Sequence, residues 1–513
     1  MSPQLQSNNR RIAKNTLFLT IRMVIVLGIG LYTSRILLQV LGVEDFGIYN
    51  VVAGFVAMFA FLNTSMNNAI QRFYNYELGK NGEDGMRRVY NCSLIAQVLI
   101  ALVIIILTET FGLWYIYEKL VLPPERFDAA LWVFQLSVIS LLFLVIQIPY
   151  SSAIMAHECM DYYAVVSVID AALKLALIFL IPLIQSDNLV IYGIIILFIS
   201  LVDFFLYYIY AKQRFPEIKI EKKFEKSLFN EILKFSGWNL FGSFSGVMKE
   251  QGLNLLLNLF FGPVVNAARG IAYQVSGGVQ SFVMNITTAA RPQMTQAYAQ
   301  GNIERTLRIM FSMSKMSYIS VFIFALPVML EVDYILHLWL GNGVPDHTGA
   351  FVVLVVFSSL INVFNPPTSF VVHATGKMKS YQTITSLFSL LLLPVSYLFL
   401  YIGCAPEIVF VLVIIFTALG QLISLLILKK LITISLRLYF GKVIMPSLMT
   451  TILSTAVPFV AYYYMDRSFL RFSVVTILSL LSVSLFSYLI EFDKDERSIV
   501  KDFIRRIKIK ING

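Results

Sequence analysis

Fourteen long apolar stretches run through this chain, and each can form a helix that crosses a bilayer, which takes about 20 mainly apolar residues. A backbone inside lipid must satisfy its own hydrogen bonds, so such stretches predict α-helices. They cover residues 14–40, 47–74, 88–117, 127–155, 162–184, 189–211, 234–261, 265–291, 308–330, 349–375, 378–402, 407–430, 441–464 and 470–491. The sequence therefore predicts an all-α, multi-pass membrane protein with about 14 transmembrane helices.

The composition agrees with this class. Of the 513 residues, 58% are hydrophobic and 14% are charged, whereas about 25% of the residues in a soluble domain are charged. The three cysteines are too far apart for a disulfide framework or a metal site. Walker, H-E-x-x-H and Gly-x-Ser-x-Gly motifs do not occur. We therefore expect no catalytic residues, no metal and no cofactor; a gradient or the membrane potential must supply the energy.

Lysine and arginine are unevenly divided between alternate connections. Most of the 40 fall in the N-terminal tail, the C-terminal tail and every second loop. The opposite loops hold only Lys119, Arg126, Arg467 and Arg471. By the positive-inside rule, both termini are cytoplasmic. This bias explains the net charge of +10 without a nucleic-acid partner, and the basic loops face membrane lipids.

Landmarks recur about 220 residues apart: Gly42 as Gly262, and Pro149 as Pro367. Each copy contains six predicted spans, so the copies are parallel repeats of the kind found in two-lobed transporters. We therefore expect an N-lobe over 1–211, a cytoplasmic amphipathic linker over 212–233 that could lie as a helix on the inner surface, a C-lobe over 234–431, and two extra helices with a basic tail over 432–513. The extra helices could serve as a groove for a lipid tail or as peripheral packing.

Six cations inside the predicted spans have no charged counterpart in the other copy: Arg22, Arg35, Lys174, Lys249, Arg269 and Lys315. Buried ionisable groups cost about 2.5–3.5 kcal/mol on insertion scales and usually face a bundle interior or water. These cations outnumber the acids, which predicts a positive cavity suited to an anionic head group. Alternatively, each has a carboxylate or carbonyl partner and is structural.

The acids inside the predicted spans are fewer. Asp170 lies one helical turn before Lys174, so these two side chains can pair. Asp203 is the only acid in its span. We expect Asp170 or Asp203 to be the carboxylate linked to a gradient of H⁺ or Na⁺, if transport is coupled to an ion.

The segment Leu41-Gly42-Val43-Glu44-Asp45-Phe46-Gly47-Ile48-Tyr49 resembles the opening helices of bacterial polysaccharide-biosynthesis exporters. These are O-antigen-flippase-like members of the multidrug/oligosaccharidyl-lipid/polysaccharide exporter superfamily. The segment Asn266-Ala267-Ala268-Arg269-Gly270-Ile271-Ala272 is similar to the same family. The resemblance implies a 6 + 6 + 2 helix arrangement and alternating access.

It further implies that the chain flips undecaprenyl-pyrophosphate-linked oligosaccharide across the bacterial inner membrane for surface polysaccharide or O-antigen synthesis. Polysaccharide polymerase and chain-length machinery would be its partners. Essential cavity cations of such flippases would correspond to Arg22 and Arg269. Span 2 lacks the further cation expected of lipid II flippases and carries Asn63, Asn67 and Asn68, which are candidate sugar contacts.

Two other functions are weighed against this one. An ion-coupled drug antiporter of the same fold would be expected to have a cavity dominated by acids. A membrane-embedded glycan polymerase or ligase generally needs a sizeable outer domain, whereas the longest predicted outer loop covers only about 331–348.

Overall fold

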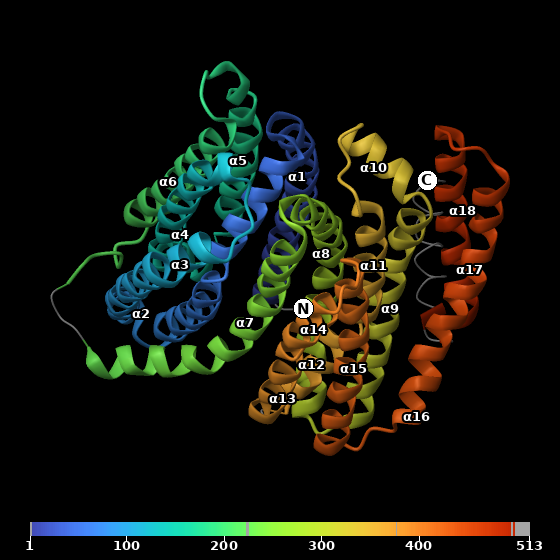
Figure 1. Ribbon diagram of the computed structural model, residues 1–513. Helices are drawn as coiled ribbons and strands as arrows, with labels where there is room; N and C mark the ends of the chain where they lie inside the picture. The colour runs from blue at the N-terminus through green and yellow to red at the C-terminus, as the bar shows by residue number, and fades with distance from the viewer. Residues whose placement is uncertain (1–2, 158, 222–224, 376, 494–495, 498–513) are drawn as a thin grey trace, which may run out of the picture. The chain divides into compact units, whose positions relative to one another are not determined.

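The computed structural model describes residues 3–157, 159–221, 225–375, 377–493 and 496–497 (Figure 1). Side chains are not described for residues 3–21 and 281–293, nor at scattered other positions. Within these ranges every regular element is a helix. The first eight are α1 (Pro3–Ala57), α2 (Ala60–Leu107), α3 (Leu113–Glu118), α4 (Phe127–Ala156), α5 (Met160–Ile178), α6 (Asn188–Arg214), α7 (Lys226–Phe261) and α8 (Pro263–Ala299).

The remaining helices follow the same pattern of long spans with short interruptions. They are α9 (Ile303–Leu330), α10 (Val332–Leu340), α11 (Thr348–Asn362), α12 (Asn365–Ala374), α13 (Met378–Leu390), α14 (Leu392–Tyr401), α15 (Glu407–Leu431), α16 (Leu436–Tyr439), α17 (Met445–Tyr464) and α18 (Phe469–Phe486). In the described part of the chain, 11 helical stretches are long and apolar enough to cross a membrane, and the first of them, Arg22–Leu78, holds two predicted spans. The more polar α7 and α8 correspond to predicted spans 7 and 8.

Several predicted spans are broken inside the membrane rather than straight. A turn at Met58–Phe59 interrupts the second span, and a short break at Val363–Phe364 divides the tenth span into α11 and α12. A π-helical turn at Thr108–Gly112 lies inside the third span. Hydropathy averaged over a span predicts its apolar length but not these local breaks, because a few polar residues hardly change the average.

The mirrored glycines occupy the same unusual backbone conformation. Gly42 has φ 78° and ψ 170°, and Gly262 has φ 76° and ψ −172°. This region is essentially restricted to glycine. Gly42 separates the first two spans, and Gly262 separates α7 from α8. The repeat seen in the sequence is therefore a repeat of helix-pair geometry.

The chain forms two compact units. The first contains Met1–Ile271, Asn342–Asp346 and Ser389–Pro406, and the second contains Ala272–Gly341, His347–Phe388 and Glu407–Gly513. In the first unit α4 packs on α2 and α6, and α1 packs on α5. Helix α7 packs on α2 and α1, so the division of the units does not fall at the 212–233 linker.

The predicted amphipathic linker is not one helix. Helix α6 ends at Arg214, residues 215–221 are non-helical, and α7 begins at Lys226. Phe215 and Ile218 are buried in the core of the first unit. The Asn91 side chain donates to the carbonyl of Lys219 at 3.1 Å and accepts from the backbone N–H of Glu221 at 2.8 Å. The segment is thus fastened to α2, and the expectation that it lies as a helix on the inner surface is wrong for 215–221.

Arg126 forms ion pairs that join three segments of the first unit. Arg126 pairs with Asp45 at 2.6 Å and with Asp187 at 2.5 Å, and so joins the connections before α4 and α6 to α1. Burial opposes ionisation of Asp187, but the hydrogen bonds from Arg126 and from the backbone N–H of Val190 outweigh it and hold the pKa of Asp187 below its usual value.

The second unit has its own packing. Helix α11 packs on α15, and α9 packs on α18, while α17 and α18 pack on each other (Figure 1). Arg471 at the start of α18 pairs with the fully buried Glu331 carboxylate at 2.8 Å. The two C-terminal spans therefore belong to the body of the second unit through α9.

Because both mirrored glycines adopt a conformation that an L-residue rarely adopts, Gly42→Ala and Gly262→Ala should each lower stability by about 1–3 kcal/mol. Gly28→Ala is the matched control: Gly28 lies inside α1 with open space around its Cβ position. Thermal denaturation of the purified protein measures the effect. A Gly28→Ala loss as large as that of Gly262→Ala would contradict the backbone explanation.

Candidate functional site

A polar pocket of about 450 Å³ lies inside the first unit. It is formed by α1, α2, α4, α5 and α6. Five of the residues singled out in the sequence line it: Arg22, Asn63, Asn67, Asp170 and Asp203. The fold therefore brings together the candidate cation, the candidate sugar contacts and the candidate coupling acids, which are up to 181 positions apart in the chain (Arg22 to Asp203).

Arg22 comes from α1. Its guanidinium carbon lies 4.8 Å from the centroid of the Tyr163 ring, within the range of a cation–π interaction. The Nε atom is buried and has no hydrogen-bond partner among the residues that the structure describes. No carboxylate of the described chain lies within 4.0 Å of Arg22, so its charge has no direct ionic partner there.

The two acids of the pocket come from neighbouring helices. Asp170 on α5 has its carboxylate 3.9 Å from the Lys174 Nζ atom, as the sequence spacing predicted. Asp203 on α6 interacts electrostatically with both Asp170 and Lys174. Its Oδ1 atom is buried without a hydrogen-bond partner in the described chain.

The charges of this pocket do not match the expected excess of cations. One cation, Arg22, and two carboxylates line it, and Lys174 beside Asp170 balances the second carboxylate. The prediction of a net positive cavity is therefore wrong for this pocket. The sequence count failed because it treated every unmirrored cation as a member of one cavity.

The amides of α2 differ in their surroundings. Asn63 is 8% exposed, and neither its Oδ1 nor its Nδ2 has a partner in the described chain. The Oδ1 atom of Asn67 accepts a hydrogen bond from Ser152 at 2.8 Å. The side chain of Asn68 lies outside the described residues, so the prediction for Asn68 stays a prediction.

Two tyrosines complete the pocket and were not singled out in the sequence. Tyr163 and Tyr207 line it, and their ring centroids are 6.4 Å apart. The sequence spacing could have identified both tyrosines as neighbours of the acids. Tyr163 precedes Asp170 by seven residues, and Tyr207 follows Asp203 by four. Residues at these spacings share one face of a helix.

Three other predicted cations of the first unit lie outside the pocket lining. Lys249 on α7 is half-buried and interacts electrostatically with the adjacent Glu250, but no carboxylate of the described chain is within 4.0 Å of its Nζ. Arg269 on α8 is 5% exposed and donates to the carbonyl of Glu250 at 2.6 Å. Arg35 lies 13 residues after Arg22 on α1, about 20 Å further along the helix.

Lys315 belongs to the second unit and is an ion-paired residue. Its side chain is 3% exposed, and Nζ lies 2.7 Å from Glu496 and 3.5 Å from Asp493. Nζ also donates to the carbonyl of Glu491 at 2.9 Å. Lys315 therefore fits the alternative that the sequence left open, a structural residue with carboxylate partners, and these partners lie about 180 residues further along the chain.

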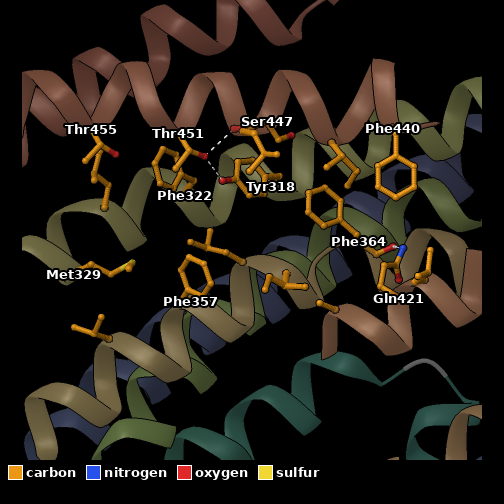
Figure 2. Close-up of a pocket in the computed structure, with 18 of the residues that line it drawn as sticks. Tyr318, Phe322, Met329, Phe357, Phe364, Gln421, Phe440, Ser447, Thr451 and Thr455 are labelled. Carbon is orange, nitrogen blue, oxygen red and sulfur yellow. Dashed lines mark hydrogen bonds between the residues drawn. The ribbon is translucent and has the colours of Figure 1, made fainter. Parts of the chain in front are cut away.

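An apolar cavity of about 480 Å³ lies inside the second unit (Figure 2). Helices α9, α11, α15 and α17 form most of its wall. Two of its polar residues are hydrogen-bonded within the cavity: Tyr318 with Thr451, and Gln421, whose amide nitrogen donates to the carbonyl of Phe364 at 3.0 Å. Aromatic and aliphatic side chains such as Phe322, Met329 and Phe357 form the remaining surface (Figure 2).

The sequence matches two family models. The model described as polysaccharide biosynthesis protein matches residues 12–298, and the model described as MatE matches residues 247–398. No curated protein matches the chain.

Solved structures with a similar fold cover most of the chain. One is the lipid II flippase MurJ in an inward closed conformation, with 14% identity, a TM-score of 0.67, and coverage of 93% of this chain and 98% of that one. Another is an inward-facing multidrug resistance MATE family transporter of the MOP superfamily, with 16% identity, a TM-score of 0.66, and coverage of 80% and 97%. A third is a MOP superfamily transporter from Pyrococcus furiosus, described by a reversed polarity of its binding pocket, with 17% identity, a TM-score of 0.60, and coverage of 81% and 95%. At these identities the likeness shows a shared fold.

The different surroundings of two span lysines lead to a test. Lys315→Ala should lower stability by about 3 kcal/mol, because it leaves buried acids without their partner. Lys249→Ala should leave stability unchanged or raise it, since no carboxylate of the described chain pairs with Lys249 and an unpaired buried charge is costly. Thermal denaturation of both purified variants compares them. Equal losses would show that Lys249 also has a structural ionic role.

Proposed function

Because the chain belongs to the polysaccharide biosynthesis protein family, we propose that it is a flippase for undecaprenyl-pyrophosphate-linked oligosaccharide. It would carry the lipid-linked repeat unit from the inner to the outer leaflet of the bacterial inner membrane by alternating access, for surface polysaccharide or O-antigen synthesis. Both termini would be cytoplasmic, as the distribution of Lys and Arg predicts.

The observation that carries this proposal is the presence of two span cations without carboxylate partners. Arg22 belongs to α1 and Lys249 to α7, and both helices lie in the first unit. In the described chain neither has a carboxylate within 4.0 Å. A buried charge that has no protein partner is costly, and an anionic ligand lowers that cost. Guanidinium and ammonium groups bind phosphate oxygens strongly, so a pyrophosphate is a suitable ligand.

The charge of the substrate also supplies a driving force. A pyrophosphate diester carries negative charge, and the cytoplasmic side of a bacterial inner membrane is electrically negative. Moving one elementary charge across 100 mV is worth about 2.3 kcal/mol, so the membrane potential favours outward movement of the anion. Asp170 and Asp203, which interact with each other in the polar pocket, are the residues we propose for coupling to H⁺ or Na⁺.

The lipid part of the substrate needs an apolar site. We propose that part of the polyprenyl chain lies in the apolar cavity of the second unit (Figure 2). Polar groups are few there, and Tyr318 and the amide nitrogen of Gln421 are already hydrogen-bonded, so the surface left for a ligand is mainly hydrocarbon and aromatic. Apolar lining of this kind suits a prenyl chain and no part of a glycan.

One observation favours a second function, an ion-coupled drug antiporter of the same fold. Two carboxylates and one arginine line the polar pocket of the first unit, whereas an anion site alone needs no acids. The charge of the transported molecule distinguishes the two functions. A glycan polymerase or ligase gains no such support, since residues 331–348 in the described chain hold α10 and short turns rather than a catalytic domain.

Loss of both unpaired cations should slow flipping strongly. In proteoliposomes with a fluorescent undecaprenyl-pyrophosphate-linked oligosaccharide, Arg22→Ala plus Lys249→Ala should slow flipping roughly a hundredfold, because one charge-assisted contact is worth about 1.5–3 kcal/mol. Arg214→Ala plus Lys430→Ala is the matched control, since both residues are exposed. Normal flipping by the first pair would refute the phosphate site.

Filling the apolar cavity should impede the lipid chain. Ala418 lines the cavity, and the adjacent Leu419 on α15 does not. Ala418→Trp should therefore slow flipping at least about tenfold, the cost of displacing a few buried methylene groups, whereas Leu419→Trp should not. The same proteoliposome assay measures both variants. Equal rates in the two variants would place the polyprenyl chain elsewhere.

A further inference from the structure

The polar pocket of the first unit holds an unusual concentration of buried polar atoms without protein partners. In the described chain these are Arg22 Nε, Asn63 Nδ2, Asn63 Oδ1 and Asp203 Oδ1, and all three residues line the same pocket. Asn63 is more than nine-tenths buried. An unsatisfied buried polar group costs about 1–3 kcal/mol and calls for an explanation such as a bound molecule.

The kinds of atom restrict what that molecule can be. Two of the four are donors, Arg22 Nε and Asn63 Nδ2, and two are acceptors, Asn63 Oδ1 and Asp203 Oδ1. A bare cation uses only acceptors, and a fully ionised anion uses only donors. A hydroxyl group donates and accepts at once. The set therefore favours a molecule with several hydroxyl groups.

The charges around these atoms favour an uncharged molecule. Arg22 and Lys174 supply two positive charges, and Asp170 and Asp203 supply two carboxyl groups. Formally these charges cancel, so a charged molecule that fills the pocket gains no net attraction from it as a whole. Arg22, which has no carboxylate within 4.0 Å in the described chain, can still contact a neighbouring phosphate. A ligand that is polar but neutral can satisfy the orphan atoms without leaving a buried charge uncompensated.

The remaining wall is suited to the less polar face of a ring. Tyr163 and Tyr207 contribute aromatic surface, and Val26, Leu144 and Ile148 contribute aliphatic surface. Aromatic side chains combine a large apolar face with a polar edge. The cavity volume of about 450 Å³ equals that of about 15 liquid waters at roughly 30 Å³ each, which is enough for one sugar ring with its hydroxyl groups.

We infer that this pocket is a carbohydrate subsite for one uncharged sugar ring. The inference rests on the proposed function in one respect, namely that the ring arrives as part of a lipid-linked glycan. The sugar bonded directly to a pyrophosphate lies next to the phosphates. Arg22, which lines the pocket and has no carboxylate partner in the described chain, is placed to contact both. Sugars with a carboxylate or an ammonium group fit the pocket less well.

The test uses the full-length protein in nanodiscs and a panel of neutral methyl glycosides with different hydroxyl configurations. Ligand-observed NMR gives their dissociation constants. At least one neutral glycoside should bind, and its glucuronide or glycosamine analogue should bind about tenfold more weakly. Asn63→Leu, which keeps the side-chain size and removes both amide atoms, should weaken binding at least about tenfold, because a hydrogen bond to a buried polar group is worth about 1–1.5 kcal/mol.

Two further variants serve as a control for the substitution and as an independent test of the pocket's charge. Asn362→Leu is the control, because Asn362 is exposed at the end of α11 in the other unit. Asp203→Asn keeps the shape of the side chain and changes its charge. It should leave the protein folded and improve binding of the glucuronide relative to the neutral glycoside. If Asn63→Leu fails to fold, the change in relative affinity for the glucuronide in Asp203→Asn still tests the site.

The outcomes separate this inference from the flippase proposal. Binding of a neutral glycoside that Asn63→Leu weakens and Asn362→Leu does not would support the subsite. Absence of glycoside binding, with normal flipping in proteoliposomes, would overturn the subsite and leave the flippase proposal intact; the orphan atoms would then serve water. Glycoside binding without flipping would support the subsite and overturn the flippase proposal.

Discussion

A bilayer cannot solvate charge, and the structure of this protein depends on how each polar group in its spans meets that constraint. The charge of Lys315 is paired inside the protein, with Glu496 at 2.7 Å and Asp493 at 3.5 Å. The charge of Lys174 is paired with Asp170 on the same helix. Arg22 and Lys249 have no carboxylate partner in the described chain. The cations that looked alike in the sequence therefore divide into residues with a carboxylate partner and residues without one in the described chain, and it is for the latter that we propose a role in substrate binding.

Many features of the scaffold could be predicted from the sequence, because each depends on residues that are close together in the chain. Apolar length predicted the spans, and the glycines at 42 and 262, which are landmarks of the repeat in the sequence, have matching φ values of 78° and 76°. The pairing of Asp170 with Lys174 also followed from helical spacing. Each of these features depends on residues within a few helical turns of each other.

The charge balance of the site could not be predicted in the same way, because it depends on distant partners. The acids of Lys315 lie about 180 residues away in the chain. Arg22, Asn63 and Asp203 reach one pocket only after α1, α2 and α6 have packed in the first unit. The segment 215–221 looked like a surface helix from its spacing of lysines and phenylalanines, but Asn91 binds its backbone and Phe215 enters the core.

The central claim is that the transported molecule is a lipid-linked glycan, and its most direct test compares two cargoes in the same vesicles. Purified protein in proteoliposomes would receive a fluorescent undecaprenyl-pyrophosphate-linked oligosaccharide in one leaflet and a cationic dye such as ethidium in the lumen, under an imposed membrane potential. We predict that the glycan lipid changes leaflet at a rate that depends on the protein and the potential, while the dye is retained. Dye efflux driven by an ion gradient, with the glycan lipid confined to its leaflet, would contradict the account and establish an antiporter.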